Sequence, residues 1–217
     1  MPLEHASGLN PFQVFSKPRN ALQGAFDFPN YIFAIGLILL QWVLLALASY
    51  GFGLKVDFTI LAFYFVSSLL TVIVSGAFIA GMGKWAKSKE AKFSSIFTAL
   101  SLLEFIKALS VVLAVILLVA FPVATDVLQQ ASSGTLSQGE LYNGVLNAFL
   151  NGPLVVALLI VLVAILLGLY SLYLLYLIID KATESTVFKN LVILVLSLVL
   201  SQIVVPWTAN SAFQLFF

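Results

Sequence analysis

Side chains that could carry out catalysis or bind a metal are scarce in this sequence. The one histidine, His5, lies in the N-terminal segment, and the chain has no cysteine. Asp57, Asp126 and Asp180 each flank an apolar stretch, so a carboxylate pair for acid–base chemistry would require two loops to fold together. A serine–histidine pair or a histidine-ligated metal would have to be built around the N-terminal segment. We therefore expect a protein that is not an enzyme, with no catalytic residues, no cofactor and no metal site.

Polar groups within apolar stretches are the second source of chemistry. Glu104 and Lys107 stand at i and i+3 where a long apolar run begins, so they can form an ion pair on a helix. This pair is either a boundary ion pair or a functional intramembrane charge. Tyr170, Tyr173 and Tyr176 share about one third of a helix circumference in another apolar run. The deeper hydroxyl groups need partners, which are either neighbouring helices or the groups of a lined polar cavity.

The elements that position these groups are long apolar segments. The chain of 217 residues is 62% hydrophobic and 9% charged, and its mean hydropathy of +1.12 excludes an ordinary soluble domain. Unbroken apolar runs predict helices, because membrane-spanning strands alternate in polarity over about ten residues. We expect an all-α polytopic integral membrane protein with five transmembrane helices, at about residues 31–50, 58–82, 105–124, 153–179 and 191–207.

Basic residues between these segments predict the orientation. Eight of the ten Lys and Arg residues would lie on one side, and Lys55 alone would lie on the other. This bias predicts a cytoplasmic N-terminus and an extracytoplasmic C-terminus. Four of the eight cluster in the second loop: Lys84, Lys87, Lys89 and Lys92. The cluster is either a marker of topology or, in addition, a contact for anionic lipid or an acidic partner. The net charge of +1 predicts no nucleic-acid partner.

Two segments next to the predicted spans are amphipathic. Residues 1–30 form a cytoplasmic N-terminal segment, in which a short interfacial helix is expected between Pro18 and Pro29, with Leu22 and Phe26 on one face. Residues 31–217 form the membrane domain. Residues 93–103 place apolar side chains on one helical face and hydroxyl side chains on the other. That segment either lies in the membrane interface or extends the third span out of the membrane.

Small residues in the second span predict close helix packing. Gly76 with Ala80, and Ala77 with Gly81, stand four residues apart, a spacing that allows helix backbones to approach. The neighbour is either another span of this chain or a second copy in a homo-oligomer.

The layout resembles a known family. The stretches NPFQVFSKPRNAL, KFSSIFTALSLLEFIKALSVV and IIDKATESTVFKNLVILVL are similar to those of prokaryotic five-span members of the Yip-domain family, the Ypt-interacting proteins. The positions that carry the likeness are Phe15, Pro18, Phe93, Leu109, Lys181 and Ala182. The resemblance implies five spans, a cytoplasmic N-terminus, no catalytic activity and a place in the cell membrane of a prokaryote. Eukaryotic relatives engage small GTPases through a longer N-terminal domain, so that contact is not carried over.

Together these observations predict a non-enzymatic membrane protein that organises membranes or partner proteins, in a trafficking or membrane-shape role. Its expected partners are the lipid bilayer, including anionic lipid, and a second copy or another membrane protein. The alternative is a small transporter, channel or lipid-handling protein that uses a groove beside Tyr170, Tyr173 and Glu104. In either case the working groups lie on or between membrane helices.

Overall fold

The secondary structure of the chain is helical throughout the part that the structure describes. The computed structural model describes residues 10–53, 58–120 and 154–216, with residues 126, 127, 130, 139, 140, 143, 144 and 147, and leaves out the side chains of residues 202–216 and of a few other helical positions. His5 and Asp57 lie outside the described residues. The helices are α1 (Gln13–Ser16), α2 (Pro18–Asp27), α3 (Tyr31–Gly51), α4 (Phe58–Trp85), α5 (Phe93–Ala120), α8 (Leu154–Thr183) and α9 (Val187–Phe216).

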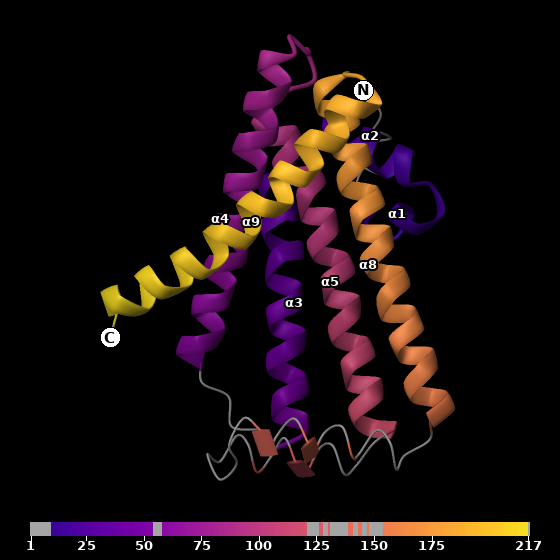
Figure 1. Ribbon diagram of the computed structural model, residues 1–217, viewed down its shortest axis with the longest axis vertical. Helices are drawn as coiled ribbons and strands as arrows, with labels where there is room; N and C mark the ends of the chain where they lie inside the picture. The colour runs from indigo at the N-terminus through magenta and orange to yellow at the C-terminus, as the bar shows by residue number, and fades with distance from the viewer. Residues whose placement is uncertain are drawn as a thin grey trace, which may run out of the picture.

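Four helices are long and apolar enough to cross a membrane: Tyr31–Gly51, Leu61–Trp85, Phe93–Ile116 and Leu158–Thr183. They run side by side, with α5 in contact with α3, α4 and α8 (Figure 1). The prediction of an all-α, multi-pass membrane protein is therefore confirmed in this form. Residues 121–124 and 153, where the third and fourth spans were expected to end and begin, lie outside the described part of the chain.

The helix α9 takes a different path from the other long helices. It begins beside the end of α8 and runs obliquely across α4, with which it packs (Figure 1). Its described apolar stretch, Val187–Ser201, is shorter than the four helices above. The five-span arrangement predicted from the sequence is thus matched by four helices of sufficient length and apolarity and by a fifth helix that is oblique.

The third long helix begins well before the predicted start of its span. Residues 93–103 continue directly into the apolar run, so this segment extends the span and does not form a separate interfacial helix. Its hydroxyl face is buried, because α2 and the start of α3 cover it. The Ser95 hydroxyl donates to the Phe26 carbonyl at 2.9 Å, and the backbone N–H of Asn30 donates to the Thr98 hydroxyl oxygen at 3.1 Å. These hydroxyl groups therefore join helices and do not face water.

The N-terminal segment packs on the bundle through its apolar face. Pro18 stands in the first turn of α2, as expected, and the helix ends at Asp27, shortly before Pro29. One face of α2 is buried against α5 and α8, with Leu22 and Phe26 each less than 5% exposed. The helix α3 follows at once, and its cap is Asn30, whose side chain accepts from the Phe33 N–H at 3.0 Å. The predicted short helix is present, and its apolar face contacts protein.

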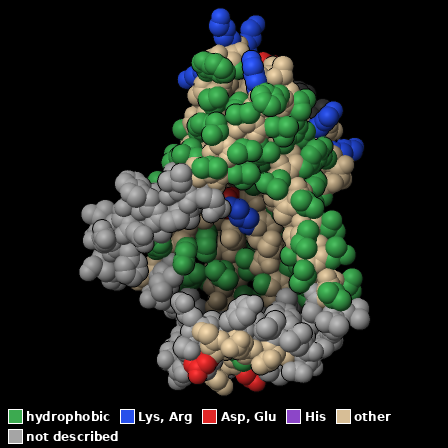
Figure 2. Space-filling view, viewed as in Figure 1, with side chains coloured by type: hydrophobic (Ala, Val, Ile, Leu, Met, Phe, Trp, Pro, Cys, Tyr) green, Lys and Arg blue, Asp and Glu red, His purple; other side chains and the backbone are tan. Residues whose placement is uncertain are grey.

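Two turns at one end of the bundle contact each other. The α4–α5 turn contains Lys87 with a φ of 63°, and the α8–α9 turn contains Glu184 with a φ of 47°. The Ser88 hydroxyl of the first turn donates to the Glu184 carboxylate of the second at 2.9 Å. In the second turn, the Asn190 side chain donates to Asp180 at 2.7 Å and accepts from the Thr183 hydroxyl at 2.7 Å. Figure 2 shows Lys and Arg side chains gathered at this end of the molecule.

A polar cavity between four helices as the candidate functional site

A cavity of about 280 Å³ lies between α4, α5, α8 and α9. Its wall is apolar apart from hydroxyl groups on three of the helices and one pair of charges on α5. The hydroxyl residues are Thr71 and Ser75 of α4, Ser171 of α8, and Ser197 and Ser201 of α9. The charges belong to Glu104 and Lys107. Polar residues at membrane depth usually face a bundle interior or a cavity in this way and mark functional sites.

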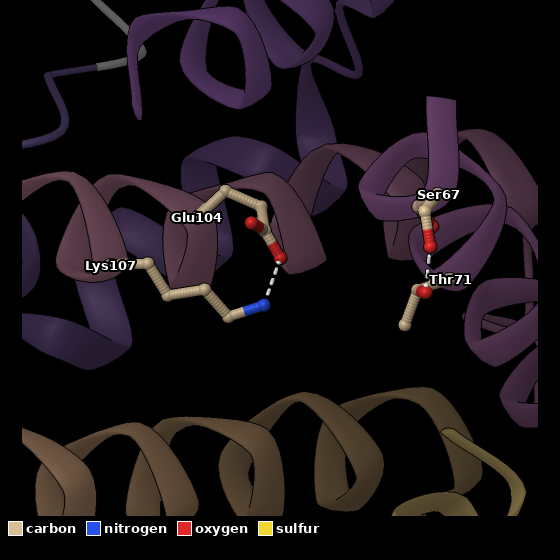
Figure 3. Close-up of polar contacts among 4 residues, drawn as sticks. All are labelled: Ser67, Thr71, Glu104 and Lys107. Atoms are coloured by element: carbon tan, nitrogen blue, oxygen red, sulfur yellow. Dashed lines mark hydrogen bonds and ion pairs between the residues drawn. The ribbon is translucent and has the colours of Figure 1, made fainter. Parts of the chain in front are cut away.

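The charged pair on α5 is asymmetric in its burial. The Lys107 ammonium donates to Glu104 Oε1 at 2.6 Å (Figure 3). The Glu104 side chain is only 4% exposed, whereas the Lys107 side chain is 53% exposed. The second carboxylate oxygen, Glu104 Oε2, is buried and has no hydrogen-bond partner in the described part of the chain. Leaving a buried charged acceptor unpaired is destabilising by about 1–3 kcal/mol or more, so this oxygen is suited to accept a hydrogen bond from a ligand.

The depth of this pair follows from its distance to the start of α3. A helix of 21 residues is about 31 Å long, which matches a hydrocarbon core of about 30 Å. The hydrogen bond from Asn30 to Thr98 places Thr98 level with the start of that helix. At about 1.5 Å per residue, Glu104 then lies about 9 Å further into the core. This geometry favours the intramembrane interpretation of the pair over the boundary interpretation.

A second buried polar atom without a partner lies in the same wall. Ser197 is 3% exposed, and its hydroxyl has no hydrogen-bond partner among the described residues. The hydroxyls of Thr71, Ser171 and Ser201 differ, because each donates to a carbonyl of its own helix at 2.7–2.8 Å. Thr71, for example, donates to the Ser67 carbonyl (Figure 3). The cavity thus offers an unpaired acceptor on α5 and an unpaired hydroxyl on α9.

The cavity opens to the side of the bundle. Two of its lining residues, Lys107 and Leu172, are exposed. Figure 2 shows basic and acidic side chains in a hollow partway along the molecule, beneath the oblique α9 and among hydrophobic side chains. At this depth the surface around the opening would face lipid, so a ligand could enter from the bilayer.

The predicted tyrosine groove is a separate place that α1 occupies. The Tyr170 hydroxyl donates to the Val14 carbonyl, and the Phe15 ring stacks on the Tyr170 ring at 5.7 Å. On the other side of α1, the Phe12 ring meets the Phe105 ring edge-on at 5.2 Å. Of the two explanations for the Tyr170 hydroxyl, hydrogen bonding between helices is the one observed, and the partner is the N-terminal segment.

The other two tyrosines line neither the cavity nor an enclosed space. Tyr173 is 44% exposed, and its ring lies 6.0 Å from that of Tyr170. Tyr176 is half-buried against the hydrophobic core. The structure therefore does not join Tyr170, Tyr173 and Glu104 into one groove: it is Ser171, Leu172 and Leu175 of α8 that face Glu104 across the cavity.

The predicted small-residue pairs divide between a packed face and an exposed face. Gly76 is buried, and a Cβ there would lie 3.2 Å from Phe93 and 3.6 Å from Leu100 of α5. Ala80 is buried as well, whereas Ala77 and Gly81 are exposed. A tighter approach lies at Gly83, where a Cβ would come within 2.5 Å of the Ala182 carbonyl oxygen of α8. The spacing rule did not identify Gly83, because its partner lies on a helix distant in the sequence.

The lysines of the second loop are exposed at the end that carries most of the basic residues. Lys84, Lys87, Lys89 and Lys92 all have exposed side chains. Beside them, the Lys189 ammonium lies over the Trp85 ring at 5.9 Å, and Trp85 is 70% exposed. The arrangement is open to either interpretation of the cluster, a marker of topology or a contact surface.

Sequence reasoning missed the hydroxyl residues of the cavity, although a signal for them exists. Thr71 with Ser75, and Ser197 with Ser201, stand four residues apart, so each pair shares a helical face. Two further polar groups were also missed: Gln41 Oε1 and the Trp42 indole N–H are buried without partners in the described part of the chain. Among the described residues, no three His, Asp or Glu side chains come together as a metal site would require.

Fold and site define an all-helical, multi-pass membrane protein with a polar cavity inside its helix bundle. Comparison with protein-family models, with curated proteins and with solved structures found no match. The function therefore has to be argued from the site itself.

Proposed function

We propose that this protein is a non-enzymatic, lipid-handling membrane protein that takes the polar headgroup of a lipid into the cavity between α4, α5, α8 and α9. The observation that carries the proposal is the presence of two buried polar groups without partners, Glu104 Oε2 and the Ser197 hydroxyl, in the wall of one cavity at membrane depth. Buried polar groups in native proteins are nearly always paired, and an exception calls for an explanation. A bound headgroup would supply the missing partners.

The size of the cavity supports a headgroup as its occupant. Pockets for whole drug-sized ligands measure about 300–1,000 Å³, and the volume of about 280 Å³ lies just below that range. The acyl chains of a lipid would therefore stay outside, along the exposed apolar side chains of α8 and α9. Leu169, Leu172 and Val195 are examples of these side chains, and each is at least 40% exposed.

A cavity-filling substitution tests this proposal. In Ser197→Leu the unpaired hydroxyl is lost and the larger side chain fills part of the cavity. The matched control is Ser110→Leu, because Ser110 is an exposed serine of α5 outside the cavity wall. The full-length proteins are released from lipid nanodiscs, and native mass spectrometry counts the lipids that each retains. We expect Ser197→Leu to lose a tightly held lipid that the wild type and Ser110→Leu keep. Equal retention by all three would contradict the proposal.

A second function, the organisation of membranes or partner proteins, is favoured by the basic end of the molecule. Trp85 and Phe188 are 70% and 76% exposed there, next to the exposed lysines of the second loop. Aromatic and basic side chains together are typical of interfaces with anionic lipid. This role agrees with the resemblance to the Yip-domain family. Replacing Lys84, Lys87, Lys89 and Lys92 with glutamine should weaken binding of soluble acidic partners or vesicles of anionic lipid; unchanged binding would leave these residues as topology signals.

We also propose the five-crossing topology, with a cytoplasmic N-terminus and α9 as the last crossing. The support is the grouping of basic residues at one end and the length of α9, 30 residues or about 45 Å, which allows an oblique helix to cross. An impermeant reagent applied to sealed cells should label tags at the two termini differently. If both tags react alike, the number of crossings is even and α9 lies along the membrane.

A further inference from the structure

The hydrogen-bonding groups of the cavity restrict the class of headgroup that it would hold. Glu104 Oε2 is an unpaired carboxylate oxygen, so its complement is a hydrogen-bond donor, best a cation. Lys107 carries three N–H donors, of which one is given to Glu104 Oε1, so its complement is an acceptor, best an anion. The unpaired Ser197 hydroxyl, in the same wall, can donate to that anion. A ligand that satisfies all three groups carries a positive donor and a negative acceptor.

The net charge of the cavity restricts the headgroup further. Glu104 and Lys107 are its only charged lining residues among those described, and their charges cancel. Bringing a net charge into a site of low dielectric constant is unfavourable unless an opposite charge is free to pair with it. A ligand without net charge is therefore preferred, and a headgroup of net charge −1 is disfavoured.

We propose that the ligand is a phospholipid with a phosphoethanolamine headgroup, a primary ammonium group joined through a short linker to a phosphate. This inference rests on the proposed lipid-handling function and names its substrate class. The ammonium group donates to Glu104 Oε2, and the phosphate accepts from Lys107 and from the Ser197 hydroxyl. Four charges then alternate in sign, with a net charge of zero.

The two most similar headgroup classes each lack one of these features. Phosphocholine has the same charges, but its quaternary ammonium has no N–H to donate to Glu104 Oε2. Phosphoglycerol has hydroxyl donors, but it brings one uncompensated negative charge. The loss of one charge-assisted hydrogen bond of roughly 1.5 kcal/mol corresponds to about a tenfold weaker affinity. We expect about that ratio between phosphoethanolamine and phosphocholine lipids of equal acyl composition.

The wild-type chain alone permits the first test. The protein is reconstituted in nanodiscs that contain equal amounts of phosphatidylethanolamine, phosphatidylcholine and phosphatidylglycerol, and native mass spectrometry measures which class is retained. Retention should persist for N-methyl and N,N-dimethyl ethanolamine lipids, which still have an N–H, and should fall at the trimethylated lipid. Retention of lipid without any preference among the classes would overturn this inference and leave the proposed function standing. Retention of no lipid would overturn both.

Two further measurements separate this assignment from structural damage and from a soluble ligand. In Glu104→Gln the carboxylate is lost and Lys107 is left as a net positive charge, so the preference should invert, with phosphatidylglycerol retained about tenfold more than phosphatidylethanolamine. Simple loss of structure would not produce this inversion, and an unchanged preference would overturn the assignment. Soluble phosphoethanolamine at equal concentration should fail to displace labelled lipid, because it has no acyl chains; effective displacement would overturn the assignment to a lipid.

Discussion

Replacing Gly83 with alanine would test the closest approach that the structure describes between α4 and α8. A Cβ at this position would lie 2.5 Å from the Ala182 carbonyl oxygen and 2.6 Å from the Ala91 Cβ. An ordinary carbon–oxygen contact is about 3.3 Å, so the first of these contacts is too short by about 0.8 Å. The obstacle is backbone and cannot rotate away, and Ala182 itself is fully buried. One of the two helices would have to move.

The size of the effect follows from two opposing terms. Overpacking is destabilising by typically 1–3 kcal/mol, and we take about 3 kcal/mol because a backbone atom blocks the new methyl group. Alanine is more favourable than glycine in a helix by up to about 1 kcal/mol. We therefore expect Gly83→Ala to lower the free energy of unfolding by about 2 kcal/mol.

The matched control is Gly81→Ala in the same helix, where a Cβ would meet no described atom within 4 Å. This control should be neutral or more stable than the wild type by up to about 1 kcal/mol. Reversible unfolding of the purified proteins in mixed micelles of increasing SDS fraction, followed by circular dichroism, gives the three free energies. If Gly83→Ala unfolds at the same SDS fraction as Gly81→Ala, the close approach of α4 and α8 is wrong.

Two further predictions concern polar contacts of the N-terminal segment. Thr98→Val removes the acceptor of the Asn30 N–H and should lower the free energy of unfolding by about 1–2 kcal/mol in the same assay; wild-type stability would mean that α5 does not hold the start of α3. Tyr170→Phe removes the hydroxyl that donates to the Val14 carbonyl and should make the segment around α1 about fivefold more sensitive to limited proteolysis. Tyr173→Phe, at a half-exposed ring, is its control, and equal cleavage of the two variants would contradict the contact with α1.

Local patterns were sufficient for the predictions that depend on neighbours along the chain. Apolar runs long enough to cross a bilayer predicted the helical class and the cores of the four long helices. The i, i+3 spacing of Glu104 and Lys107 indicated an ion pair that the structure shows at 2.6 Å. Pro18 and Pro29 bracketed α2. In each case the decisive contact lies within one helix or at its ends, where sequence spacing translates directly into distance.

Tertiary structure alone decided how these helices use their polar groups. The hydroxyl face of residues 93–103 appeared suited to water, but α2 covers it through the contact of Ser95 with Phe26. A cavity wall that contains both Glu104 and Ser197 exists because α5 and α9, far apart in sequence, border the same space.

The chain by itself thus determined that it forms apolar helices, where most of them lie and which charges can pair along α5. It did not determine which helix faces which, because many rotations and crossing angles bury apolar surface about equally well in lipid. Close contacts such as that of Gly83 with the Ala182 carbonyl exist only in one particular packing. For that reason the cavity, the place of α1 beside Tyr170 and the proposed headgroup site could be recognised only in the folded bundle.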